Sequence, residues 1–555
     1  MISQSISHGS ALVRLVIACL ILFLVGFFTL PPMDRDEPRF AQASKQMIET
    51  GDLVTIHFQE EARLKKPVGI YWLQAGVVKS AEALGVPDAA HKIWLYRIPS
   101  LLGALTAVLL TYWAALAIMT RNGAYIAALL FASTILIGVE ARLAKTDAVI
   151  TATVVAAMGA LLRVYLARRE PLLKVTAGAG NAFIFWTALA IGILVKGPVT
   201  PMMPILAMLV LSIKDGDVSW LKVLRPARGL LWCLALVLPW FILITLKTHG
   251  AFFAESVGKD LGSKVAGGQE SHGMWPGFYL AAFWATAWPM APFAAVAAPF
   301  VWAQRRDPAV TFLLAWLVPA WLVFEAVPTK LPHYVLPLYP AIAILIALGF
   351  VRGAFASWRI WQKAVLVLLP IVALVVPGAA VFGIVKYDMA ISPLTVVAGL
   401  VAAAVAAGAA GLLWRGQVMM GIFAAVLAAM ALSATAYIGI LRLPAFDYFA
   451  LSPRLSAAVA AAFPAGSCDP EIAATSYHEP SLIFLTRTDL AITDGAGAAT
   501  FLKQGGCRAA LVEAKDEPAF QAALGPSDEV ALATRIAGIN LNGGHKLDIG
   551  VYVRH

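Results

Sequence analysis

Charged side chains are scarce in this sequence of 555 residues. Lys, Arg, Asp and Glu make up 13% of the chain and apolar residues 60%, whereas a soluble domain is nearer a quarter charged. Apolar runs of about 18 residues or more recur along most of the chain, and the roughly ten-residue alternating segments of a transmembrane barrel are not seen. These patterns exclude an ordinary soluble protein and predict an all-α polytopic membrane protein.

A signal-peptide cleavage site is also lacking after the first apolar run. Residues 11–31 are apolar apart from Arg14 and a few small polar side chains, and the run ends at Pro31-Pro32 without the small-residue pattern that signal peptidase needs. We therefore expect a retained first membrane helix.

Thirteen candidate spans follow from the apolar runs. They are residues 11–31, 97–118, 122–140, 147–167, 180–196, 198–213, 229–247, 276–302, 309–327, 334–351, 364–385, 393–413 and 418–441. Alternate connections carry Lys and Arg with few acidic residues, which places the N-terminus in the cytoplasm by the positive-inside rule. This distribution accounts for the net charge of +10 without a nucleic-acid partner.

The predicted topology divides the chain into two domains. Residues 1–441 form the membrane domain, with a first external loop at 32–96 and a second at 248–275. Residues 442–555 lack a spanning run and combine Gly, Asp and Pro turns with short strand-like and alanine-rich stretches. An odd number of crossings puts this C-terminal part outside, as a small periplasmic α/β domain. The clearest local patterns are strands at 509–513 and 547–553 and a helix at 455–463.

Cysteine is rare, with four residues in the whole chain. Cys19 and Cys233 lie within apolar spans and are expected to pack as small hydrophobic side chains. Cys468 and Cys507 lie in the C-terminal part, which would be periplasmic in a bacterial cell. Because disulfides persist in that compartment, we predict a Cys468–Cys507 bridge.

A dense charge cluster follows the first apolar run. It reads Asp34-Arg35-Asp36-Glu37-Pro38-Arg39. Ionised groups at a membrane exit mark a candidate functional site. The alternative is a solvated loop in which Asp36 caps a helix and Pro38 occupies its first turn. Apolar spacing predicts an amphipathic helix over 38–49 and a second interfacial helix over 67–84.

Further polar residues gather on the same predicted external face. They include Lys66, Glu140, Lys145, Asp147, Lys196, Lys330, His333 and Tyr334. The lysines could be snorkelling anchors, His333 could bond a backbone carbonyl, and Asp147 could cap a helix. No set of residues has the clustered spacing of a metal site. Carboxylates and cations beside hydrocarbon suit a substrate with a lipid tail and a phosphate head.

Four motifs in order along the chain carry a family resemblance. They are Asp36-Glu37-Pro38-Arg39-Phe40-Ala41, Lys65-Lys66-Pro67-Val68-Gly69-Ile70-Tyr71-Trp72, Lys196-Gly197-Pro198 and Lys330-Leu331-Pro332-His333-Tyr334-Val335-Leu336-Pro337. The chain resembles the bacterial membrane glycosyltransferases related to protein O-mannosyltransferases and to the lipid A aminoarabinose transferase. The resemblance covers nearly the whole chain and implies a GT-C fold that takes a sugar from a polyprenyl-phosphate carrier.

By resemblance, two aspartates and several cations acquire roles. Asp36 matches the family's first-loop catalytic aspartate, and Asp147 matches the second one. The residues expected near the donor phosphate are Arg39, Lys66, Lys196 and Lys330. Those expected to line the same cavity are Glu37, His333 and Tyr334.

Two positions depart from the family pattern. The glutamate that usually precedes the Lys-Pro of the aminoarabinose transferases is Lys65 here, which puts a metal site and that specific sugar in doubt. The tyrosine that usually follows the arginine is Phe40, which removes a hydroxyl contact.

The sequence thus predicts an inverting, metal-independent glycosyltransferase without a cofactor in the bacterial inner membrane. Its partners would be a polyprenyl-phosphate sugar, membrane lipids and a lipid or glycan acceptor, such as lipid A, another envelope glycan or a protein. A monomer is plausible. The alternatives are a transporter or flippase of a lipid-linked sugar and an inert scaffold for envelope assembly; transporters place their sites near the membrane midplane, often within repeats.

Overall fold

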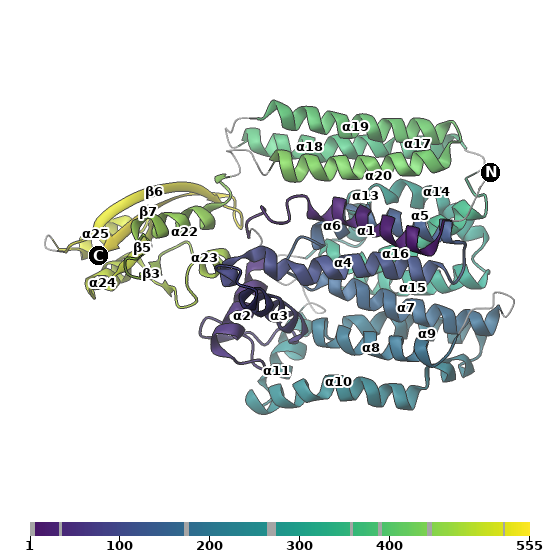
Figure 1. Cartoon of the computed structure of the whole chain (residues 1–555), viewed down its shortest axis with the longest axis horizontal. Coiled ribbons are helices and arrows are strands. Elements are labelled where there is room, and N and C mark those ends of the chain that lie inside the picture. Colours follow the sequence, from purple (N-terminus) through teal and green to yellow (C-terminus); the bar gives the residue numbers. More distant parts are fainter. Residues whose placement is uncertain are drawn as a thin grey trace.

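The computed structural model describes residues 6–32, 36–170, 177–263, 273–355, 359–386, 391–440, 447–464, 466–525 and 528–554. These residues form a helical membrane part and a C-terminal mixed α/β part (Figure 1). The N-terminal end of the first helix, α1 (His8–Leu24), lies at the end of the helical part opposite the C-terminal domain.

Within the described residues, nine helices are long and apolar enough to cross a membrane. They are Ile93–Ala115 (α4), Asp147–Arg169 (α7), Ala179–Lys196 (α8), Pro226–Lys247 (α10), Pro308–Ala326 (α15), Pro332–Val351 (η5 and α16), Ile360–Gly383 (α17 and α18), Pro393–Trp414 (α19) and Val418–Tyr437 (α20 and η6). A bent pair, Phe278–Thr286 (α13) and Met290–Ala303 (α14), would make a tenth span. The expectation of a helical multi-pass membrane protein is therefore confirmed.

The remaining predicted spans correspond to shorter or interrupted helices. These are α1, Arg121–Ala132 (α5) with Ile135–Glu140 (α6), and Val199–Asp215 (α9). The first run forms a helix of 17 residues, because the chain turns after Leu24. The break between α5 and α6 falls at Ser133 and Thr134, whose hydroxyls bond backbone carbonyls of the preceding turn.

Helix α7 is the centre of the membrane part. The protein buries 89% of its apolar window, compared with 28% for α10, which exposes large apolar side chains such as Leu231 and Leu246. Gly103 of α4 permits a close approach to α7, since a Cβ atom there would lie 2.8 Å from the backbone nitrogen of Val149. This crossing holds the first turn of α7 against α4.

The segment predicted to be the first external loop, a name kept below, contains both predicted helices, α2 (Asp36–Thr50) and α3 (Gly69–Ala83). Between them, β1 (His57–Phe58) and β2 (Glu61–Ala62) form a small antiparallel hairpin. Several polar side chains of α2 are buried, among them Gln42, Ser44 and Lys45. The C-terminal domain covers Gln42 and Lys45, whereas Ser44 donates to Gln74 of α3 at 2.6 Å.

The C-terminal domain docks on α2 through polar contacts. Gln42 donates to the Thr488 hydroxyl at 2.8 Å, and Lys45 donates to the Phe484 carbonyl at 3.2 Å. Figure 1 shows the domain beyond α2, at one end of the helical part. Part of the second external loop also lies at this end, as α11 (Ala251–Phe253) and the π-helix η4 (Ala254–Leu261).

A five-stranded mixed sheet organises the C-terminal domain, in the order β4-β3-β5-β7-β6. Strand β3 is parallel to β4 and β5, whereas β7 is antiparallel to β5 and β6. The strands are β3 (Glu471–Ala474), β4 (Ala491–Ile492), β5 (Arg508–Glu513), β6 (Ala531–Asn540) and β7 (His545–Arg554). The helices are α22 (Leu451–Ala462), α23 (Pro480–Leu485), α24 (Gly495–Lys503) and α25 (Glu517–Ala523).

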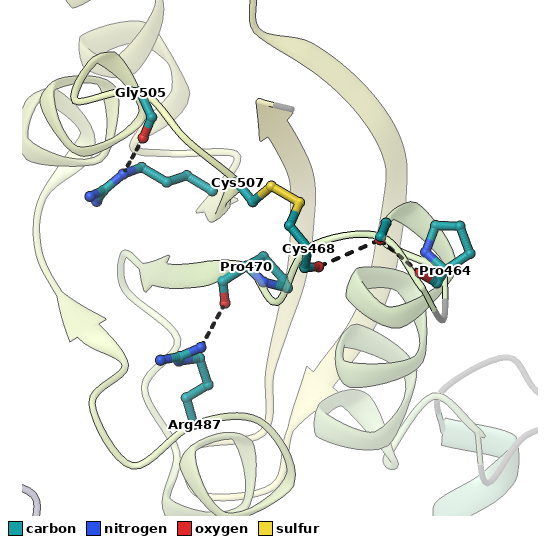
Figure 2. The surroundings of a disulfide bond; sticks show 8 residues. Pro464, Cys468, Pro470, Arg487, Gly505 and Cys507 are labelled. Carbon is teal, nitrogen blue, oxygen red and sulfur yellow. Dashed lines mark hydrogen bonds between the residues drawn. A yellow bond between two sulfur atoms is a disulfide. The ribbon is translucent and has the colours of Figure 1, made fainter.

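These elements include the predicted helix and both predicted strands. The predicted domain boundary at 441/442 lies outside the described residues. Figure 2 shows the disulfide between Cys468 and Cys507, which links the segments that lead into β3 and β5. The two Cα atoms are 6.2 Å apart.

Candidate functional site

Asp147 and Lys196 form an ion pair where α7 begins and α8 ends. Their side chains are 6% and 11% exposed, so the pair is largely shielded from solvent. The His333 Nε2 atom lies 3.8 Å from Asp147 Oδ2. Three segments far apart in the sequence thus bring a carboxylate, an ammonium and an imidazole together.

A second carboxylate stands on the other side of the imidazole. Glu140 Oε1 lies 3.7 Å from His333 Nδ1 and 3.5 Å from Lys145 Nζ. The side chains of Glu140 and Lys145 are both nearly buried. The sequence placed these two residues on the external face without assigning them a role. The sequence feature that could have identified them is an acidic residue at the end of an apolar run, followed a few residues later by a lysine.

Asp36 opens α2 and is half-buried. It lies close to Arg63, whose Nε donates to the Tyr71 hydroxyl at 3.3 Å. Burial is the largest single effect and lowers the pKa of the Arg63 guanidinium, whereas Tyr71 raises it. The carboxylates of Asp36 and Asp260 raise the same pKa further, so the Arg63 cation is held in its charged form.

Tyr334 connects the two aspartates expected from the sequence. Its hydroxyl is within electrostatic range of Asp147, Asp260 and Asp36. The Lys196 ammonium lies 5.3 Å from the centre of its ring. Asp36 and Asp147, which are far apart in the sequence, therefore both act electrostatically on the same tyrosine.

Lys66 joins the same cluster from the first external loop. Its Nζ forms an ion pair of 3.1 Å with Asp260 Oδ2, on η4 of the second external loop. It also acts electrostatically on His333, as do Lys145 and Lys196. Three ammonium groups and several carboxylates thus surround His333 and Tyr334, an arrangement that can hold an anionic head group.

Glu37 has a different position from its neighbour Asp36. It forms a two-point ion pair with Arg97, with distances of 2.6 and 2.9 Å, and neither side chain is exposed. Glu37 also accepts from the Ala144 backbone at 2.9 Å. It was predicted to line the cavity, and the structure places it where it fastens the start of α2 to α4. The sequence did not identify Arg97.

Two further predicted cations lie apart from the ion-pair cluster. The Lys330 ammonium is 3% exposed and donates to the carbonyls of Val327, at 2.8 Å, and Met274, at 3.2 Å. It therefore holds the turn before His333. Arg39 is half-buried and borders a separate, large cavity.

That cavity has a volume of about 1380 Å³ and lies between the first external loop and the C-terminal domain. Its lining includes Arg39, Lys45, Glu49, Glu60, Glu61, Arg63 and Lys65 from the first loop and His478, Glu479, Arg487, Thr488 and Asp489 from the C-terminal domain. Its lining carries both acidic and basic side chains. Arg63 connects the cavity to the Asp36 side of the cluster.

No group of three or more His, Cys, Asp or Glu residues within the described ranges is arranged to hold a metal ion. Asp34, which the sequence grouped with the charge cluster, lies outside the described residues.

Comparison with known proteins adds family evidence. The dolichyl-phosphate-mannose-protein mannosyltransferase (PMT) family matches residues 11–251. An undecaprenyl phosphate-alpha-4-amino-4-deoxy-L-arabinose arabinosyl transferase from Aeromonas hydrophila is 26% identical over 383 residues, which cover 65% of this chain and 66% of that protein. The enzyme of the same description from Yersinia pestis is 27% identical over 60% of this chain and 58% of its own. The chain therefore spans less than two thirds of the length of these relatives.

Solved structures resemble this protein in fold over a longer part of the chain than the sequence matches cover. ArnT from Cupriavidus metallidurans, bound to undecaprenyl phosphate, superposes with a TM-score of 0.75 and 18% identity over 98% of both chains. The oligosaccharyltransferase AglB from Archaeoglobus fulgidus has a TM-score of 0.52 and 13% identity, over 91% of this chain and 69% of its own. The family match, the relatives and the shared fold confirm the resemblance noted in the sequence: the chain is similar to the PMT family of membrane glycosyltransferases over residues 11–251 and has an ArnT-like fold.

Proposed function

We propose that this protein transfers a sugar from a polyprenyl-phosphate carrier to an acceptor at the periplasmic face of a bacterial inner membrane. The observation that carries the proposal is the grouping of Asp36, Asp147, Lys66 and Lys196 around Tyr334 and His333. Carboxylates serve proton transfer and ammonium groups serve a phosphate leaving group, which are the two needs of this reaction. The relatives are named for an undecaprenyl-phosphate-linked sugar, which supports this donor class.

The donor phosphate would meet Lys66 and Lys196, whereas Arg39, which was also expected beside it, borders the separate large cavity. Both lysines belong to the cluster, and each is paired with a carboxylate. Lys330 is bound to two carbonyls, so we propose that it orders the turn that carries His333 and Tyr334.

The reaction would be a single displacement with inversion. An acceptor oxygen attacks the anomeric carbon, its proton passes to the Asp36 carboxylate, and the bond from that carbon to the phosphate oxygen breaks. Polyprenyl phosphate leaves with the electron pair, and Lys66 and Lys196 stabilise its charge. Asp147 positions Lys196. This scheme uses no metal and no covalent sugar–enzyme intermediate.

The proposed topology has thirteen crossings, an N-terminus in the cytoplasm and the C-terminal domain in the periplasm. The start of α1 and the C-terminal domain lie at opposite ends of the helical part (Figure 1), and the Cys468–Cys507 disulfide suits an oxidising compartment. The acceptor would approach through the 1380 Å³ cavity, which is large enough for a glycan head group. Lipid A, another envelope glycan or a protein could each supply the attacking oxygen.

The test is transfer by purified protein with an undecaprenyl-phosphate-linked sugar and envelope acceptor lipids, followed by mass spectrometry of the products. Asp36→Asn should lower turnover by about 10²-fold or more, because the general base is lost. The matched control is Glu82→Gln, in an exposed ion pair with Lys79 on α3. Undiminished turnover by Asp36→Asn would contradict the mechanism. Movement of the carrier lipid across proteoliposomes without a covalent product would favour a transporter.

A further inference from the structure

Both lysines proposed to meet the donor phosphate are already occupied by carboxylates. Lys196 is paired with Asp147, which belongs to the buried helix α7. Lys66 is paired with Asp260, which belongs to the short π-helix η4 of the second external loop. The two carboxylates therefore lie on different kinds of element. Asp147 belongs to the central helix of the membrane part, and Asp260 belongs to a loop segment.

Asp260 reaches into the cluster from this loop. Its side chain is 9% exposed, and one of its oxygens lies 3.1 Å from Lys66 Nζ. Its charge also acts on Arg63 and on the Tyr334 hydroxyl. A single carboxylate thus stands among the groups that would surround an anionic ligand of the proposed site.

We propose that Asp260 occupies the place of the donor phosphate while the site is empty and releases Lys66 when the phosphate binds. This inference rests on the proposed function, since it takes Lys66 to be a phosphate ligand. A phosphodiester and a carboxylate each carry one negative charge and compete for the same ammonium group. The exchange keeps Lys66 paired at every stage and avoids a buried, uncompensated cation.

Asp260 also competes with the released polyprenyl phosphate for Lys66. After transfer, the carrier is a phosphate monoester with a charge between about −1.5 and −2 near neutral pH, so it is held by lysines more strongly than the donor was. Asp260 offers Lys66 an alternative partner and thereby weakens retention of the product. It is a positioning residue that acts through Lys66, and its expected effect is on binding of the carrier lipid.

The experiment measures binding of undecaprenyl phosphate to the full-length protein in detergent by isothermal titration, with undecaprenol as the probe that lacks phosphate. Asp260→Asn should bind undecaprenyl phosphate about 3- to 10-fold more tightly than the wild type, because a larger fraction of the protein has Lys66 available. Lys66→Gln should bind it more weakly. Combining the two substitutions should abolish the gain, since Asp260 acts through Lys66.

Glu82→Gln is the matched control, because it also removes one external carboxylate from an ion pair, and its affinity should equal that of the wild type. Asp260→Ser serves as a second variant if Asp260→Asn is poorly folded. In turnover, Asp260→Asn should show a lower KM for the donor and stronger inhibition by added undecaprenyl phosphate. A purely structural role for Asp260 would not produce that pair of changes.

The outcomes separate this inference from the proposed function. Unchanged or weaker binding by Asp260→Asn, alongside weak binding by Lys66→Gln, would overturn the inference and leave the phosphate role of Lys66 intact. Tighter binding of undecaprenyl phosphate that persists when Asp260→Asn is combined with Lys66→Gln would also overturn the inference. The tighter binding would then come from the loss of a negative charge in general and not from the release of Lys66. Wild-type affinity in Lys66→Gln would overturn the phosphate role of Lys66 and this inference with it.

Discussion

Glu37 and Arg97 form a fully buried ion pair, and Arg97 also donates to the carbonyls of Phe27, Leu30 and Pro31. The pair joins three parts of the chain: the end of the first membrane segment, the start of α2 and the start of α4. Asp36 immediately precedes Glu37, so this contact determines where the proposed base stands. The charge cluster after the first apolar run therefore contains one residue that anchors α2 and, next to it, the residue proposed as the base.

Breaking this anchor should destabilise the protein. Glu37→Gln leaves the Arg97 guanidinium buried without its counter-charge, which typically costs about 3–5 kcal/mol. We expect a clearly lower midpoint of thermal unfolding in detergent and a loss of transfer activity, since α2 is displaced. Glu82→Gln, in an exposed pair, should change the midpoint little. Equal stability of Glu37→Gln and wild type would show that the pair does not anchor α2.

The Asp147–Lys196 pair should control turnover. Asp147→Asn removes the charge that positions Lys196 near the leaving phosphate, and we expect kcat to fall by about 10²-fold, a size typical of losing one preorganised electrostatic contact. The measurement is release of polyprenyl phosphate under saturating donor. Because Asn is nearly isosteric, the unfolding midpoint serves as the check on folding. A change confined to KM would instead place Asp147 in donor binding.

The Cys468–Cys507 disulfide should stabilise the C-terminal domain. It closes a loop with a sequence separation of 39 residues, for which chain entropy predicts about 4 kcal/mol. Replacing both cysteines by serine in the full-length protein should increase hydrogen exchange in β3 and β5 and leave the membrane helices unchanged. Two free thiols in a non-reducing digest of the wild type would contradict the assignment.

Asp52 should make a pH-dependent contribution to stability. Burial would raise its pKa, but hydrogen bonds from Lys247 and from the Val54 and Thr55 backbone lower it to about 2. An acid whose pKa is depressed by folding stabilises the folded state above its unfolded pKa, so this contribution is complete above about pH 4 and is lost as the pH falls toward 2. Asp52→Asn should therefore unfold at a lower temperature than wild type at pH 7, and the gap should narrow at pH 3. A difference in unfolding temperature that is the same at pH 7 and pH 3 would contradict the idea that the ionised Asp52 carboxylate stabilises the fold.

Much of the architecture was determined by the sequence itself. The long apolar runs specified a multi-pass helical protein, local spacing specified α2 and α3, and turn residues with short apolar stretches specified the C-terminal strands at β5 and β7. These features depend on neighbours within a few residues, so they can be recognised without the fold. The motifs around Asp36, Lys66, Lys196 and Lys330 likewise indicated the family.

Only the tertiary structure decided which charges meet. Glu37 forms an ion pair with Arg97, 60 residues away in the sequence, and Lys66 forms one with Asp260, 194 residues away. Glu140 and Lys145 join His333 because the end of α6, the start of α7 and η5 converge at one end of the helical part. Gln42 and Lys45 of α2 are buried because they contact the C-terminal domain. In each case the partner is set by helix packing over long sequence separations, and a charged residue in a sequence does not specify its counter-ion.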